Sequence, residues 1–271
     1  MHEEPSNFPD NDAYVEAVHD KGLAFDLQTM SRRKMFAAIG GAGLLAVTGG
    51  WLRGADPAAA ACAAEIESET AGPFPADGTN GPNVRTTSGV VRSDIRPSFG
   101  GATGVADGIP LTIKLTVLNT RCAPLVGAAV YLWHCDRLGR YSLYSSGATN
   151  QNYLRGIQTT DSTGALTFTS IFPACYPGRW PHAHFEVYSS LANATSGAGR
   201  PVKTSQIALP QSTCASVYAT SAYSSSVAPF SRISLATDGV FRDDLAAREM
   251  ATVSGSVTAG FVASLAVTVN A

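Results

Sequence analysis

The chain has 271 residues, of which 45% are hydrophobic and 15% are charged, so it can bury a core of ordinary size in one large or two small domains. Its formal net charge is -2 and its isoelectric point is near 6.2, and basic residues form no run outside the N-terminal region. This charge pattern excludes a nucleic acid or an anionic membrane surface as the main partner.

The N-terminal region carries an export motif. Arg32 and Arg33 precede a moderately apolar run that ends near Leu52, and small residues follow up to a cleavage position near Ala60. This order is typical of a signal for the twin-arginine translocation machinery. We expect residues 1–60 to be the export signal and flexible N-terminus.

Residues 61–271 are expected to form the mature domain, outside the cell or in its envelope, and in the periplasm if the cell has an outer membrane. The apolar run is short and glycine-rich, so the mature form is expected to have no stable membrane span. An N-terminal membrane anchor, or a lipid on Cys62, is the alternative.

From Gly100 onward, short runs of alternating apolar residues are separated by turn residues, with little helical periodicity. This spacing predicts an all-β fold, an antiparallel β-sandwich of about eight strands with long loops that carry the functional site. Residues 189–201 are expected to be a loose surface loop, and residues 245–251 are the one candidate for a helical turn. The most distinct strands are expected at 111–119, 127–134, 165–172, 182–189, 203–209 and 261–269.

Five cysteines remain after the export motif: Cys62, Cys122, Cys135, Cys175 and Cys214. Disulfides form outside the cytoplasm, and an odd count leaves one thiol over. The strand between Cys122 and Cys135 would hold those two apart. We expect Cys175 to pair with Cys214.

The histidines suggest a metal site. After the export segment only His134, His182 and His184 remain, and the period of two in a strand places His182 and His184 on one face. Two readings fit this spacing, a half-buried strand with polar residues outside or a pair of metal ligands. Tyr141 and Tyr176 favour the metal, because a phenolate is a hard anionic donor that suits a trivalent ion such as Fe(III).

Three segments together resemble the intradiol ring-cleavage dioxygenases, a family related to catechol 1,2- and protocatechuate 3,4-dioxygenases, and in particular its secreted bacterial type. They are "TAGPFP", "PLVGAAVYLWHCDRLGRYS" and "YLRGIQTTDSTGALTFTSIFPACYPGRWPHAHFEV", and the resemblance runs from about Thr70 to the C-terminus. It implies a β-sandwich that holds non-haem Fe(III), with the ligands at Tyr141, Tyr176, His182 and His184.

The resemblance also implies the reaction. A small aromatic diol of the catechol type would be opened by O2 between its hydroxylated carbons to give a muconate-type diacid. Tyr176 and His184 would be axial, with Tyr176 displaced by the substrate, while Tyr141 and His182 would be equatorial. Arg179 would stabilise negative charge on the substrate ring, and Gln206 would line the substrate pocket.

Three alternatives stay open from the residues. Tyr144 competes with Tyr141 for the ligand position. His134 could join His182 and His184 in a three-histidine zinc site of hydrolytic type. An extracellular β-sandwich binding module without activity is the third possibility.

Overall fold

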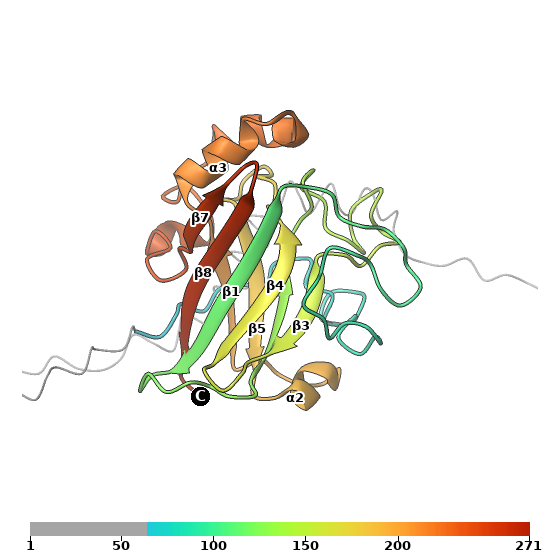
Figure 1. Cartoon of the computed structure of the whole chain (residues 1–271), viewed down its shortest axis with the longest axis vertical. Helices are drawn as coiled ribbons and strands as arrows, with labels where there is room; N and C mark the ends of the chain where they lie inside the picture. The colour runs from blue at the N-terminus through green and yellow to red at the C-terminus, as the bar shows by residue number, and fades with distance from the viewer. Residues whose placement is uncertain (1–63) are drawn as a thin grey trace, which may run out of the picture.

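The computed structural model describes residues 64–271, which form two four-stranded β-sheets packed face to face (Figure 1). Neighbouring strands are antiparallel except β1 and β8, which run parallel. The all-β sandwich is therefore confirmed, with one parallel pair as the difference. The sheet that we call the β1 sheet has the order β4-β1-β8-β7, and its strands are β4 (Ala165–Ile171), β1 (Pro110–Asn119), β8 (Gly260–Val269) and β7 (Thr252–Ser256). The β5 sheet has the order β3-β2-β5-β6, and its strands are β3 (Arg155–Thr159), β2 (Ala129–Trp133), β5 (His182–Tyr188) and β6 (Lys203–Ala208).

The core between the sheets follows from the alternation of apolar side chains. In β1 the alternate residues from Leu111 to Val117 are buried, as are Ala183, Phe185 and Val187 of β5. Each fully buried large apolar side chain contributes about 1.5–3 kcal/mol of transfer free energy. One face of each sheet is thus used for the core.

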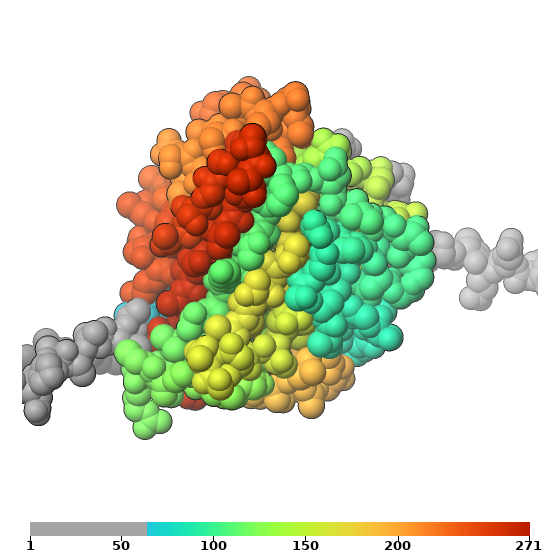
Figure 2. Space-filling model, in the orientation of Figure 1, coloured from blue at the N-terminus to red at the C-terminus, as the bar shows by residue number. Residues whose placement is uncertain are grey.

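The outer faces of the two sheets differ. The outer face of the β1 sheet is open, and Figure 2 shows its strands side by side across the surface. The outer face of the β5 sheet is covered by the segments before β1 and after β2, whose apolar residues pack on Tyr131 and Trp133 of β2. Every residue of β2 and of β5 is therefore buried on both faces of the sheet.

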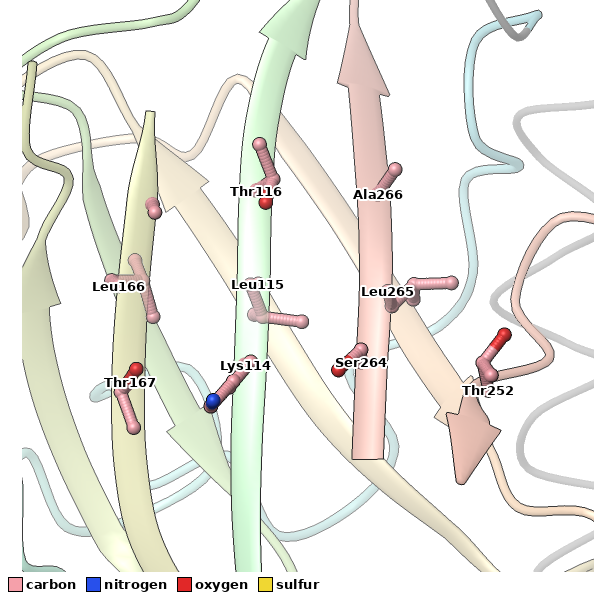
Figure 3. Close-up of a pocket in the computed structure, with 10 residues that line it drawn as sticks. Lys114, Leu115, Thr116, Leu166, Thr167, Thr252, Ser264, Leu265 and Ala266 are labelled. Carbon is pink, nitrogen blue, oxygen red and sulfur yellow. The ribbon is translucent and has the colours of Figure 1, made fainter. Parts of the chain in front are cut away.

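A groove of about 390 Å³ marks the outer face of the β1 sheet (Figure 3). Polar side chains from all four strands line it, including Lys114 and Thr116 of β1, Thr167 of β4, Ser264 of β8 and Thr252 of β7. Its lining contains none of the side chains that the sequence singles out for chemistry.

Short helical segments fill the connections after β5 and β6 (Figure 1). They are α2 (Leu191–Thr195), α3 (Gln211–Tyr218), α4 (Val227–Phe230) and the 3-10 helices η2 (Ser221–Ser226) and η3 (Phe241–Asp243). At 245–251, where a helical turn was predicted, the structure has a hydrogen-bonded turn closed by the Met250 amide on the Ala246 carbonyl but no helix. Leu245 and Ala246 have φ of 60° and 55°, in the left-handed region that a right-handed helix excludes.

The loop at 189–201 is more ordered than predicted. It contains α2, and the guanidinium of Arg85 donates hydrogen bonds to the carbonyls of Ala194, Gly197 and Gly199. A buried arginine that binds three carbonyls holds the loop against the sandwich.

The predicted pairing of Cys175 with Cys214 is wrong. Both thiols are free and buried, as is Cys135, while Cys122 is disulfide-bonded. The Sγ of Cys175 lies 3.5 Å from the Arg179 carbonyl and that of Cys214 lies 3.8 Å from the Leu209 carbonyl, so each thiol has a backbone acceptor of its own.

The predicted export signal at 1–60 lies outside the described residues, and so does Cys62. Within 64–271, none of the helices has the length and apolar character needed to cross a membrane.

Candidate metal centre

Four polar side-chain atoms meet beside the β5 sheet. The Tyr141 hydroxyl lies 3.2 Å from the Tyr176 hydroxyl and 3.2 Å from His184 Nε2. The Tyr176 hydroxyl lies 3.2 Å from His182 Nε2, which lies 3.1 Å from His184 Nε2. The contacts close into a ring in the order Tyr176, Tyr141, His184, His182, which we call the tyrosine–histidine ring. Tyr176 and His184 therefore face each other across it, as do Tyr141 and His182.

The local sequence explains how three of these residues converge. His182 and His184 are alternate residues of β5 and project from its outer face, away from the core. Tyr176 begins the turn "YPGR", in which the Arg179 amide donates to the Tyr176 carbonyl and Gly178 has φ of 82°. Proline followed by a glycine at positive φ is the pattern of a type II turn, and this turn brings Tyr176 back over the start of β5.

Tyr141 reaches the ring from the loop after β2. Its amide donates to the Ser145 hydroxyl, and its side chain is 1% exposed. Tyr144, the competing candidate, lies elsewhere, because its hydroxyl accepts from the Ala76 amide and donates to the Asn80 carbonyl. The structure therefore favours Tyr141 over Tyr144.

His134 has hydrogen-bond partners of its own outside the tyrosine–histidine ring. Its Nδ1 is 2.7 Å from the Cys135 carbonyl and its Nε2 is 2.7 Å from the Ser170 hydroxyl, so both ring nitrogens are used. Among residues 64–271 there is also no cluster of three or more His, Cys, Asp or Glu side chains suited to a metal ion. The three-histidine zinc site is therefore contradicted.

Both histidines of the tyrosine–histidine ring are in the neutral form. His182 Nδ1 lies 2.5 Å from the Trp180 carbonyl and must donate its proton to it. Nε2 is then unprotonated, and its lone pair faces the other members of the tyrosine–histidine ring. Burial lowers the pKa of His182 and of His184 well below the usual value, and the charge of Arg179 lowers both further. The imidazoles therefore stay uncharged at neutral pH.

The tyrosines differ in their exposure. Burial raises the pKa of Tyr141 well above 10, and the neighbouring Tyr176 raises it further. A phenolate at Tyr141 consequently needs a strong cation beside it. Tyr176 is half-buried, whereas Tyr141, His182 and His184 are at most 2% exposed, so Tyr176 marks the open side of the ring.

The packing around His184 restricts the rotation of its imidazole. The indole of Trp133 stacks on it with an angle of 3° between the planes and 5.1 Å between centroids. Gly72 has φ of 69°, and a Cβ at this position would lie 3.2 Å from the His184 Cε1. The glycine of "TAGPFP" thus allows the N-terminal segment to lie against a ring histidine.

Arg179 and Gln206 lie together beside the ring. Arg179 Nη1 is 3.5 Å from His182 Nε2, and its Nη2 donates to Gln206 Oε1 at 2.6 Å. The Gln206 amide donates to the Thr70 carbonyl at 2.9 Å. The structure brings both predicted residues to the site, but Gln206 contacts Arg179 rather than the ring itself.

Two buried charged residues at this site were missed from the sequence. Asp238 accepts a hydrogen bond from Arg179 Nε at 3.0 Å. Arg155 of β3 donates to the backbone carbonyls of Phe74 and Ser142 and so joins the N-terminal segment to the loop that carries Tyr141. The only local signal was the turn pattern "TDG" at Asp238, and many surface turns share it.

The family model described as "Dioxygenase" matches residues 98–201, which include the tyrosine–histidine ring and Arg179. A search of curated proteins finds no match.

Solved structures give the fold. An intradiol ring-cleavage dioxygenase from Tetranychus urticae is 25% identical, with a TM-score of 0.56, and the alignment covers 67% of this chain and 87% of that one. A hydroxyquinol 1,2-dioxygenase from Pseudomonas putida is 14% identical, with a TM-score of 0.50, and the alignment covers 95% of this chain and 75% of that one. The second of these supports the fold alone.

Proposed function

We propose that this chain, which is related to the intradiol ring-cleavage dioxygenases, is a non-haem Fe(III) enzyme that opens catechol-type aromatic diols with O2 to give muconate-type diacids. The observation that carries the proposal is the closed tyrosine–histidine ring, with neighbouring atoms 3.1–3.2 Å apart. Atoms bound to one metal at about 2.0–2.1 Å lie this close to one another.

The four donors suit ferric iron. Two neutral imidazoles and two phenols would hold the ion, and both phenols would ionise on binding it. Because burial resists ionisation of Tyr141, the ion must be a strong Lewis acid, which favours trivalent iron over zinc. When bound, the ion supplies the Lewis acidity and the electron-accepting capacity that make a bound catecholate reactive toward O2.

Tyr176 is the base in this proposal. It is the most exposed member of the ring, and it is carried by a turn rather than by the sheet. Its phenolate oxygen takes a proton from one catechol hydroxyl as the substrate enters, while the buried Tyr141, His182 and His184 keep their places. His184, which would keep its place, lies across the ring from Tyr176.

Arg179 supplies positive charge at the substrate side of the ring. Its Nη1 faces His182, and its side chain is 7% exposed, so its charge acts where solvent screening is weak. A fixed cation stabilises the negative charge that builds on the substrate ring. Gln206 holds one edge of this guanidinium and would therefore act on the substrate through Arg179.

The proposal is tested by supplying ferric iron and catechol to the protein. We expect one O2 consumed for each catechol and a ring-opened diacid as product, with no product from protein that was kept free of metal. A protein that binds catechol and iron but consumes no O2 would instead be the binding module without activity.

The export route is a separate part of the proposal. Residues 1–60 would direct the folded protein through the twin-arginine machinery, so that 61–271 act outside the cytoplasm. Replacing both Arg32 and Arg33 by lysine is expected to retain the protein in the cytoplasm, as measured by cell fractionation. Unchanged export of the double variant would contradict this route.

A further inference from the structure

Asp238 lies between two turns that are far apart in the sequence. Its Oδ1 accepts from the amides of Val240 and Phe241 at 2.8 and 2.9 Å. Its Oδ2 accepts from the Trp180 amide at 2.6 Å and from Arg179 Nε at 3.0 Å. Each carboxylate oxygen therefore accepts two hydrogen bonds, one pair from each turn.

The Arg179–Asp238 pair is almost fully removed from water, with side chains that are 7% and 0% exposed. Removal of one member of a buried ion pair leaves the other charge uncompensated. Separating the two side chains therefore has a high free-energy cost, so the arginine is fixed relative to the backbone at 238–241.

The hydrogen bonds divide the guanidinium into three edges. Nε binds Asp238, Nη2 binds Gln206, and Nη1 faces His182 Nε2. With two edges held, the planar group has one orientation, and that orientation directs Nη1 to the tyrosine–histidine ring.

Phe241 completes the contact. Its amide binds Asp238, its ring centroid lies 5.8 Å from Arg179 Cζ, and it lies 6.4 Å from the His182 ring centroid. Phe241 is fully buried. Asp238 thus places both the Arg179 guanidinium and the Phe241 ring beside His182.

We propose that Asp238 is a positioning residue that orients the Arg179 guanidinium toward the tyrosine–histidine ring, and that residues 238–241 therefore form part of the site. This inference rests on the proposed function. The carboxylate oxygens of Asp238 bind Arg179 and three backbone amides rather than the ring atoms, so Asp238 acts through Arg179.

The test combines Asp238→Asn with Arg179→Gln and the double variant. Asparagine keeps the size of the side chain, but its amide nitrogen cannot accept a hydrogen bond. We expect kcat for catechol to fall by about 100-fold, as for the loss of a charge-stabilising group, while iron content stays at the wild-type level. In the Arg179→Gln background, Asp238→Asn is expected to add less than about a 3-fold loss, because both changes remove the same contribution.

A second readout needs no metal and no variant at Asp238. In the metal-free wild-type protein, the Arg179 Nε–H resonance, assigned by its loss in Arg179→Gln, is expected to exchange with solvent far more slowly than that of the exposed Arg121. Exchange as fast as at Arg121 would overturn the proposal. This measurement remains available if Asp238→Asn does not fold.

Asp94→Asn is the matched control. Asp94 Oδ1 also accepts from a backbone amide and from an arginine Nε, both of Arg96, at 3.1 and 2.9 Å, but it lies at the surface. We expect wild-type kcat from this variant. Multiplicative losses in the double variant of Asp238 and Arg179 would assign Asp238 a purely structural role, whereas an inactive, iron-free wild type would remove the proposed function itself.

Discussion

The outer faces of the two sheets have opposite characters. The β1 sheet is open to solvent and bears the groove of Figure 3, lined by threonine, serine, alanine and leucine with one lysine. The β5 sheet is covered, and the tyrosine–histidine ring lies beneath that cover. The groove has one lysine and otherwise only hydroxyl and apolar side chains, whereas the buried polar side chains of the proposed site converge beneath the cover of the β5 sheet. The proposed function therefore rests on the convergence of buried polar groups and not on the groove.

The largest expected effect comes from a substitution in the tyrosine–histidine ring, beneath the cover of the β5 sheet. Tyr141→Phe removes one donor of the ring without changing its volume, and we expect ring cleavage to fall by on the order of 10³-fold, since metal-ion catalysis supplies several kcal/mol. Iron content and product formation are measured together. Tyr144→Phe is the matched control and should keep both; loss of iron in Tyr144→Phe alone would show that the ligand was wrongly assigned.

The next largest effect concerns the stability of the segments that cover the β5 sheet. Arg155→Met leaves the carbonyls of Phe74 and Ser142 without their donors, and an unpaired buried polar group costs about 1–3 kcal/mol. We expect the free energy of unfolding of the metal-free protein to fall by about 3 kcal/mol, measured by urea denaturation. Arg121→Met at the exposed surface should change it by less than about 0.5 kcal/mol. Equal losses would show that Arg155 has no special part in holding the loop of Tyr141.

A smaller effect depends on pH. Burial and, to a smaller extent, the charge of Asp244 together raise the pKa of Glu249 to about 7. The folded state then binds this proton more tightly than the unfolded state, so stability is full below about pH 4.5 and falls as the pH rises to about 7. Glu249→Gln should remove this fall and stabilise the metal-free protein by about 2 kcal/mol at pH 8, with no gain at pH 4.

The sign of this dependence has an internal control. Hydrogen bonds from Thr163 and Ala165 lower the pKa of Asp161, so its contribution to stability is lost as the pH falls. Asp161→Asn should therefore destabilise the protein at neutral pH and have little effect at low pH. A gain from Glu249→Gln that is the same at pH 4 and pH 8 would contradict the account of Glu249.

The smallest effect belongs to the open sheet. Lys114→Ala and Thr116→Ala change side chains of the groove on β1 (Figure 3), whereas the two histidines of the tyrosine–histidine ring belong to β5 of the other sheet. We expect unchanged kcat for catechol and a change in stability within about 0.5 kcal/mol for each variant. A clear loss of activity from either would mean that the groove takes part in the reaction.

The sequence placed six of the expected strands, most of them by apolar residues that alternate along a full-length strand. β3 was missed since Arg155 and Gly156 interrupt its pattern, although Arg155 is buried by hydrogen bonds. β7 was missed because both of its faces are largely exposed and polar. Local pattern therefore found the strands that face the core and lost those whose burial depends on the rest of the fold.

The same limit applies to the site. His182 and His184 share a strand and Tyr176 shares a turn with Arg179, so the sequence could bring these residues together. Asp238 lies 59 residues from Arg179 along the chain, and its pairing is set by tertiary packing. An aspartate in a turn looks the same in sequence whether it caps a surface loop or binds a buried arginine.

The visible absorption spectrum of the iron-loaded protein tests the central claim most directly, before and after catechol is added without O2. Tyrosinate bound to Fe(III) absorbs visible light, so we predict a coloured protein whose band shifts when catechol is added, and a weaker band in Tyr176→Phe. A colourless protein after ferric iron has been supplied would contradict the assignment of the tyrosine–histidine ring as the iron site.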